Sequence, residues 1–290
     1  MHACYGRLCV DDSFRRLFNL DSETTLKQQY RLTADELAAL RGIDRTMLDF
    51  FASSLKSKRK KRLQRVYPMT FALPDVDHYY QRFCQLYMAK PHTSSSQDAI
   101  DFGYFLEDSV LQSDDFPAYS PDLVRFERLS FCAHLASNTA LEPDEHRSLQ
   151  GNSEVSLDSR PRLRSNVVIG SFHYDVTEFA RLSQTGSDPM ALTPVDGYTI
   201  LIRELNRESG LQMFRINNPT KLLLDMCDGR QPLAEVGARA ASALGASLSE
   251  EQLLEVITRL HSLQLIDLSP GSLGGGLTEQ THGAADMESL

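Results

Sequence analysis

The spacing of apolar residues changes once along this chain, and the change limits the folds that the chain can adopt. Over residues 12–136, apolar side chains recur every three or four positions, as Leu48, Phe51 and Leu55 do, which predicts helices. Prolines such as Pro68 and Pro91 interrupt this pattern and divide it into roughly five or six short helices. We therefore expect the first half to be a helical bundle.

The alternation typical of strands begins at residue 167. VVIGSFHYDV alternates, GYTILIREL is rich in β-branched residues, and LQMFRIN follows NRESG, so the last two predict a hairpin. Helical spacing then returns. We expect an α+β fold with a helical bundle at 12–136, a linker or crossover at 137–166 that has room for one short strand, a winged-helix-like domain at 167–268 with a small antiparallel sheet and three helices, and a disordered tail at 269–290.

Several residues predict where helices begin and end. Thr33 followed by Glu36 is a capping box, and Ser249 is a good N-cap for the last helix. In the stretch LLLDMCDGRQPLAEVGARAASAL, Gly229 is placed to end one helix in the left-handed conformation. Pro232 is placed in the first turn of the next helix. This stretch therefore predicts two helices joined by a sharp turn.

Composition excludes some classes of protein. The chain has 290 residues, 41% hydrophobic and 24% charged, with a formal net charge of −9, which is typical of a globular protein and argues against general nucleic-acid binding. No apolar run approaches the ~20 residues that span a bilayer, and MHACYGRLCVDDSFRRL lacks the apolar region of a signal peptide. We expect a cytoplasmic protein that does not bind membranes.

The sequence contains no recognisable catalytic or metal-binding motif. Cys4 and Cys9 are close together, but we expect this terminus to be flexible, which favours incidental or packed thiols over metal ligands. The eight histidines are scattered without a ligand spacing. We predict no catalytic residue, no metal site and no cofactor in this chain. An enzyme with its own metal remains an alternative.

A run of basic residues at positions 56–65 is the sharpest charge feature. Such a cluster can contact phosphates, but no aromatic residues are interleaved for base stacking. A solvated helix face, or a patch that meets an acidic partner, is the better interpretation. A DNA-binding winged-helix regulator remains the leading alternative function.

The C-terminal part resembles a known peptide-binding module, the PqqD-like recognition element of ribosomally synthesised peptide pathways. That family has a strand hairpin, a helix that ends in a CDG-type stop, and two further helices. Ala234, Glu235 and Val236 fit its second helix start. The other matching positions are Leu224, Cys227, Asp228, Gly229, Leu260 and Leu263.

The first half is similar to the helical domain in partner proteins of multinuclear non-heme iron-dependent oxidative enzymes. One departure is around Phe131, where many relatives have Trp, because this chain has none. The matching marks are Tyr67, Pro68, Tyr80, Phe83, Pro91, Ser95, Gly103, Phe105, Leu106, Pro121, Asp122, Leu123, Arg125 and Glu127.

The two resemblances together imply a subunit of a peptide-modifying complex. Such a subunit is not an enzyme on its own. It binds a ribosomally made precursor or carrier peptide and presents the peptide's C-terminal cysteine end to an iron-dependent oxidative enzyme, with which it forms a heterodimer. The iron is held by that partner enzyme. The chain resembles most the branch of the 3-thiaglutamate pathway, and also that of methanobactin biosynthesis.

Peptide binding by strand addition predicts a specific set of contacts. If LQMFRIN is an edge strand, its main chain can pair with an extended peptide while nearby pockets give specificity. The pattern is equally compatible with a strand that only covers the helices. The predicted contacts are Leu211, Gln212, Met213, Phe214 and Arg215 on the strand, with Gln252 and Arg259 on the last helix.

Overall fold

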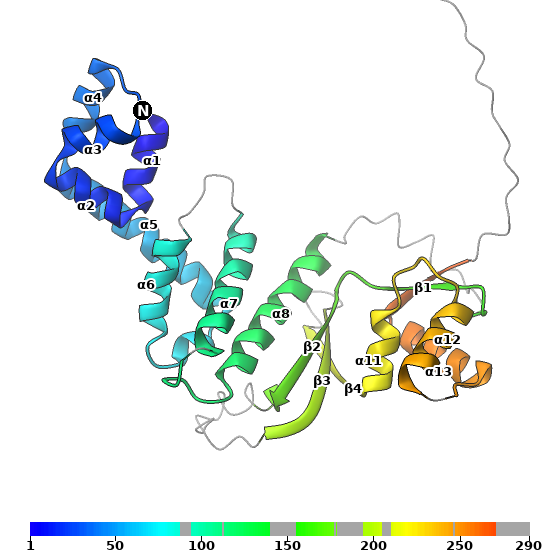
Figure 1. The fold of residues 1–290 in the computed structure, drawn as a ribbon. Coiled ribbons are helices and arrows are strands. Elements are labelled where there is room, and N and C mark those ends of the chain that lie inside the picture. Colours follow the sequence, from blue (N-terminus) through cyan, green and yellow to red (C-terminus); the bar gives the residue numbers. More distant parts are fainter. Residues whose placement is uncertain are drawn as a thin grey trace, which may run out of the picture. The chain divides into compact units, whose positions relative to one another are not determined.

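The computed structural model describes residues 1–87, 94–111, 113–139, 155–176, 178, 194–204, 210–245 and 247–270 (Figure 1). It combines helices with small antiparallel sheets, so the predicted α+β class is confirmed. The chain forms two compact units: the first holds Met1–Leu141 and Ser165–Asn218, and the second holds Glu142–Arg164 and Pro219–Leu290. Most of the predicted tail, from residue 271, lies outside the described residues.

The first unit begins with four short helices, α1 (His2–Val10), α2 (Asp12–Leu20), α3 (Ser22–Gln29) and α4 (Ala34–Arg41). The capping box of Thr33 and Glu36 at the start of α4 is confirmed. The expected flexible terminus is wrong, because Cys4 and Leu8 are buried in one core with Phe14 and Phe18. Cys4 and Leu8 are four positions apart and so share one face of α1.

The remaining helices of this unit are longer, apart from one short 3-10 turn. They are α5 (Arg45–Val66), the 3-10 turn η1 (Thr70–Ala72), α6 (Val76–Leu86), α7 (Ser95–Leu111) and α8 (Ser120–Thr139). Asp44 caps α5. The helix ends just before Pro68, as predicted. The predicted break at Pro91 lies outside the described residues.

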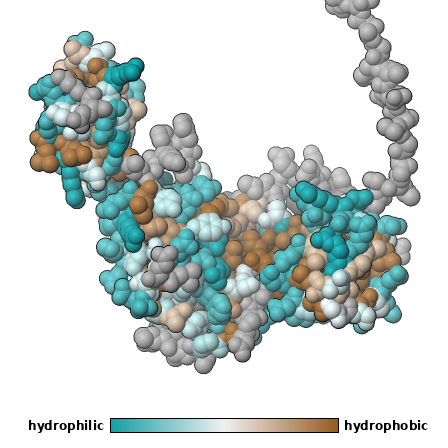
Figure 2. All heavy atoms as spheres, viewed as in Figure 1, coloured by the Kyte–Doolittle hydropathy of each residue, from teal (hydrophilic) through white to brown (hydrophobic). Residues whose placement is uncertain are grey.

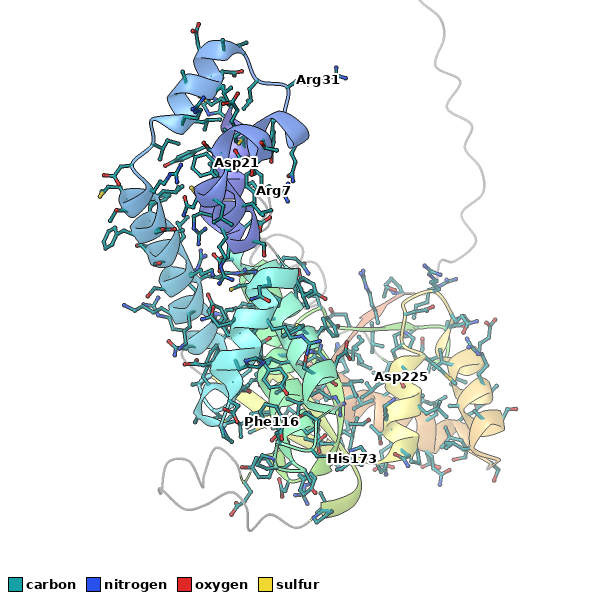
Figure 3. All side chains as sticks on the ribbon, turned by 60° about the vertical axis from the view of Figure 1, so that its left-hand side comes forward. Arg7, Asp21, Arg31, Phe116, His173 and Asp225 are labelled. Atoms are coloured by element: carbon teal, nitrogen blue, oxygen red, sulfur yellow. The ribbon has the colours of Figure 1, made fainter. Side chains whose placement is uncertain are left out.

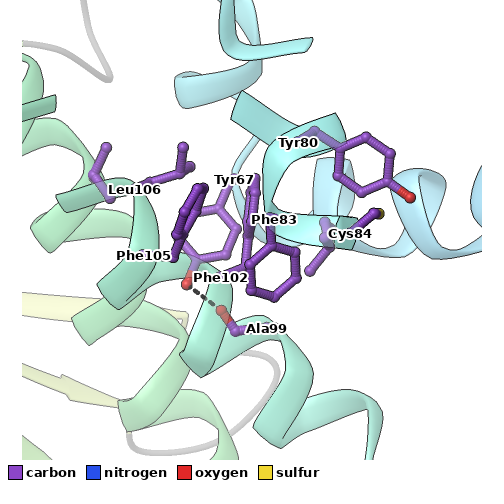
Figure 4. Packing of buried hydrophobic residues seen from close by; sticks show 10 residues of the cluster. Tyr67, Tyr80, Phe83, Cys84, Ala99, Phe102, Phe105 and Leu106 are labelled. Carbon is purple, nitrogen blue, oxygen red and sulfur yellow. Dashed lines mark hydrogen bonds between the residues drawn. The ribbon is translucent and has the colours of Figure 1, made fainter. Parts of the chain in front are cut away.

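An aromatic core joins α5, α6 and α7 (Figure 4). Tyr67 is fully buried at the end of α5, and its hydroxyl donates a 2.7 Å hydrogen bond to the carbonyl oxygen of Ala99. Phe102 packs edge-on against both Tyr67 and Phe83. Several residues that carry the resemblance to partner proteins are therefore part of this core, namely Tyr67, Tyr80, Phe83, Phe105 and Leu106.

Three strands complete the first unit: β2 (Val167–Tyr174), β3 (Pro194–Glu204) and β4 (Leu211–Ile216). They form an antiparallel sheet in the order β2-β3-β4. The predicted β3–β4 hairpin is confirmed by the pairing of Glu204 with Leu211, although NRESG itself lies largely outside the described residues.

The sheet belongs with the helical half, which differs from the predicted domain boundary at residue 167. Phe172 of β2 and Val176 just after it share a buried core with Leu123 and Phe126 of α8. The period-two pattern showed that this strand has an apolar face, but it could not show which helix covers that face.

The second unit contains β1 (Arg160–Leu163), α11 (Asn218–Asp225), α12 (Leu233–Leu244), α13 (Glu250–Ser262) and β5 (Ile266–Ser269). β1 pairs with β5 in an antiparallel two-stranded sheet. Gly229 has φ +79°, the predicted left-handed conformation, but α11 already ends at Asp225, so this glycine lies in the turn after the helix and does not end it. Pro232 is the N-cap of α12 and lies just before its first turn, one position earlier than expected. None of the described helices is long and apolar enough to cross a membrane.

Candidate peptide-binding site

β4 forms one edge of the three-stranded sheet. Among the strands that the structure describes, it pairs only with β3. The side chains of Leu211, Met213 and Arg215 are exposed, and those of Gln212 and Phe214 on the opposite face are half-buried. At an edge strand, every second residue directs its N–H and C=O away from the sheet, so β4 has the backbone geometry to receive an added strand.

The exposed face of β4 combines apolar and charged groups. Leu211 and Met213 are 40% and 39% exposed, so two large apolar side chains stand next to each other on this face. Arg215 forms an ion pair with Asp175, which follows β2. Its side chain is nevertheless 62% exposed, so this ion pair is of modest strength.

The opposite edge of the sheet is fastened to α8. The carboxylate of Asp122 accepts hydrogen bonds from the backbone N–H groups of His173 and Tyr174, and Arg125 donates to the carbonyl oxygen of Ser171 at 2.9 Å. The side chain of His173, labelled in Figure 3, remains 82% exposed. The sheet therefore has one edge held by a helix.

Gly170 allows β2 to approach α8 closely. A Cβ atom at this position would lie 2.5 Å from Cδ1 of Leu129 and 2.7 Å from Cζ of Phe172. Such a contact would force the strand and the helix apart, or displace both side chains. The lack of a side chain at Gly170 thus allows the sheet to pack directly on α8.

α8 also holds the turn that follows α5. Glu127 is only 4% exposed, and its carboxylate accepts hydrogen bonds from the backbone N–H groups of Met69 and Thr70, both at 2.9 Å, and from the Thr70 hydroxyl. Burial raises the pKa of Glu127 to about 7, while these three donors favour its charged form. On the neighbouring turns, Arg125 and Arg128 share Glu107 of α7.

The polar residues of the PDLVRFE motif are thus connectors between elements. Asp122 holds β2, Arg125 holds β2 and α7, and Glu127 holds the turn at Met69 and Thr70. The sequence marked these residues by resemblance only and assigned them no role. Their partners are 18 to 58 positions away in the chain, so local pattern alone could not reveal them.

The two predicted contacts on α13 lie in the other unit. Gln252 belongs to a capping box with Ser249: it accepts the Ser249 N–H at 3.1 Å, and its own N–H donates to the Ser249 hydroxyl at 3.2 Å. Arg259 is exposed in the last turn of α13, where a cation is favoured by the helix dipole. The structure thus groups the five β4 residues on one strand, and places Gln252 and Arg259 on a different body.

The turn between α11 and α12 has a structural role. Gly229 donates its N–H to the carbonyl oxygen of Pro161, and Leu163 donates to that of Cys227 at 2.8 Å. Cys227 is 3% exposed, and burial raises the pKa of its thiol to about 12. The thiol donates to the Leu223 carbonyl oxygen, so it is packed and protonated.

Among the described residues, no group of three or more His, Cys, Asp or Glu side chains could hold a metal ion. Comparison with protein-family models and with curated protein sequences gives no match to this chain. Its function is therefore inferred from the residues and from their geometry.

Proposed function

We propose that this chain is a non-catalytic partner subunit of a heteromeric peptide-modifying complex. It binds a ribosomally made precursor or carrier peptide and presents the peptide's C-terminal cysteine end to an iron-dependent oxidative enzyme. In this proposal the iron and its ligands belong to the enzyme, and this chain contributes binding and orientation.

The observation that carries the proposal is the asymmetry of the sheet. One edge, β2, is bound to α8 through Asp122 and Arg125, and the other edge, β4, exposes Leu211 and Met213. A peptide added to β4 would gain main-chain hydrogen bonds from a sheet whose opposite strand, β2, is anchored to α8. Pre-organisation of this kind improves affinity, because little entropy is lost on binding.

A bound peptide would raise the concentration of its reactive end near the enzyme. Short flexible tethers give effective concentrations of roughly millimolar. A subunit without catalytic residues can therefore accelerate a reaction that takes place in another chain. The resemblances to a PqqD-like element and to partner proteins of iron enzymes support this interpretation as analogy.

Co-expression with a candidate iron-dependent oxidative enzyme tests the proposal directly. The expected result is a one-to-one complex on gel filtration, with iron found by elemental analysis in the complex and not in this chain purified alone. The metal count of the chain alone is the matched control. Stoichiometric iron in the isolated chain would instead make it an enzyme with its own metal.

A DNA-binding winged-helix regulator is the second candidate. The observation that favours it is the set of exposed cations on α5, namely Lys58, Lys61, Arg62 and Arg65. Duplex binding through such residues weakens steeply with salt, by a slope of about −0.9 per phosphate contact in a log–log plot. Strong salt-dependent duplex binding without binding of a carrier peptide would favour this candidate.

A further inference from the structure

The basic run of α5 is divided between two faces of the helix. Lys56, Arg59 and Lys60 form ion pairs with Asp12, Asp98 and Asp77 of neighbouring helices. Arg59 is buried, and it also packs over the ring of Phe83. These three cations are therefore neutralised within the unit and help to hold α5 in place.

The other four cations form a stripe that faces solvent. Lys58, Lys61, Arg62 and Arg65 are spaced i, i+3, i+4 and i+7, so they lie on one side of the helix. All four are exposed, and none forms an ion pair with the residues that the structure describes. No acidic residue occurs in α5 after Asp49. We call these four cations the basic stripe. Together with Leu55 they line a shallow groove.

The same side of α5 is apolar at its N-terminal end. Met47, Phe50 and Phe51 are 62%, 70% and 46% exposed. They are spaced i, i+3 and i+4, so they share one side of the helix. Steps of three or four residues along this side lead from Phe51 through Ser54 to Lys58, so the apolar residues and the basic stripe lie on the same face. Figure 2 shows apolar surface on the lobe formed by α1–α4 and the start of α5. From Met47 to Arg65 the face extends about 27 Å along the helix.

We infer that this face of α5 is a docking surface for an acidic, amphipathic helix of a partner protein. The apolar end would bury the partner's apolar residues, and the basic stripe would pair with its carboxylates. Neighbouring exposed apolar side chains of this kind are found at protein interaction sites. The chain has a formal net charge of −9, so four neighbouring cations without an ion pair among the described residues are a local exception. Complementary charge between such cations and an acidic partner steers association.

A protein segment fits the face better than a nucleic acid does. A phosphate backbone could pair with the basic stripe, but it would leave Met47, Phe50 and Phe51 uncovered. The inference goes beyond the proposed function, because it concerns α5, requires no contact with β4, and holds for any partner with this pattern.

The test uses the full chain and a synthetic helical peptide of about 20 residues, labelled for fluorescence anisotropy. One half carries leucines at helical spacing, and the other half carries glutamates at the spacing of the basic stripe. A matched peptide has glutamine in place of glutamate. We expect the glutamate peptide to bind about tenfold more tightly than the glutamine peptide, and to weaken as salt rises above ~0.15 M.

Variants of the chain locate the contact. K61E/R62E should weaken binding of the glutamate peptide about tenfold or more, and F50S should weaken binding of both peptides. The matched controls are R82E, at an exposed arginine on α6, and L20S, at a leucine that is 84% exposed. Neither control should change the affinity. Melting curves of all variants should match that of the parent, because every substituted side chain is exposed.

Three results would overturn the inference. The first is equal affinity for the glutamate and glutamine peptides, or binding of neither. The second is an equal loss in the control variants. The third is tighter binding of a DNA duplex than of the glutamate peptide, together with loss of duplex binding in K61E/R62E. That outcome would make the face a nucleic-acid surface. None of these results bears on β4, so failure here is distinguishable from failure of the proposed function.

Discussion

The carboxylate of Asp122 on α8 accepts a 2.8 Å hydrogen bond from the backbone N–H of Tyr174 at the end of β2. The same carboxylate accepts the N–H of His173. Asp122 is only 3% exposed, so these hydrogen bonds form largely out of contact with water. One buried side chain thus joins a helix to a strand that follows it by some 50 residues.

Replacing Asp122 by alanine should weaken the attachment of the sheet. Two backbone N–H groups would lose their acceptor, which should lower the free energy of unfolding by about 2–4 kcal/mol. Urea unfolding measures the loss, and hydrogen exchange should be faster at the amides of His173 and Tyr174. The control is D35A, at an exposed position on α4, which should change little. Unchanged exchange at both amides would contradict the assigned role.

Glu127 should make stability depend on pH. Its folded-state pKa is raised to about 7 by burial, above the ordinary value of 4.5, so the folded state keeps a proton that the unfolded state loses. Stability should therefore fall as pH rises from about 4.5 to about 7, by roughly 3 kcal/mol, and level off above. Urea unfolding at about pH 5 and about pH 8 measures the change.

The variant E127Q separates this effect from those of other groups. Glutamine does not titrate, so the fall in stability between the two pH values should shrink. The variant should also be less stable than the parent at low pH, because its NH₂ group cannot accept a backbone N–H. An equal pH dependence in parent and variant would show that Glu127 is not the group responsible.

Two glycine-to-alanine substitutions in helices should have opposite effects. At Gly103 of α7, a Cβ atom would overlap the hydroxyl of Tyr67 and lie 2.8 Å from Cδ of Arg128, so G103A should destabilise by about 1–3 kcal/mol. At Gly6 of α1, nothing lies within 4 Å. G6A should stabilise by about 0.5–1 kcal/mol, because alanine is the better helix former.

A second substitution tests the cause of the G103A loss. Y67F removes the hydroxyl that a Cβ atom would overlap, although it also removes the hydrogen bond to Ala99. The double variant should therefore be more stable than the sum of the two single effects predicts. Strict additivity would mean that the overlap with Tyr67 is relieved in some other way.

Proline substitutions in β4 should test the strand-addition proposal. Neighbouring residues of a strand direct their N–H groups to opposite sides. One of the two variants Q212P and M213P therefore removes an N–H that faces β3, and the other removes an N–H that faces the outer edge. We expect both to abolish binding of the carrier peptide in a titration, and only one to lower stability strongly. The charge reversal R259E should weaken binding if α13 also contacts the peptide.

The control for M213P is L248P. Leu248 is 39% exposed, as Met213 is, and lies in the loop before α13. This variant should bind the peptide as the parent does. Unchanged peptide affinity in Q212P, M213P and R259E would rule out β4 and α13 as the binding site.

Much of the local structure could be predicted from short stretches of sequence. Helix starts depend on residues within one turn, such as Thr33 with Glu36 and Ser249 with Gln252. These signals act through hydrogen bonds to neighbouring backbone groups, so no distant partner is needed. The strands at 167–174 and 211–216 were also predicted from local signals, the first from alternation and the second from the turn before it.

Tertiary structure decided which elements meet. Arg160 of β1 pairs with Ser269 of β5, more than a hundred residues away in the chain. Strand β2 packs on α8, and its sheet belongs to a different unit from α12 and α13. The basic run at 56–65 was one feature in the sequence, and folding divided it into paired and solvent-facing cations. The sequence by itself determined the three strands of the larger sheet and several helix starts, but neither helix α1 nor strand β5. Packing chose their partners, because any apolar face can be buried by many others, and only the folded chain selects one.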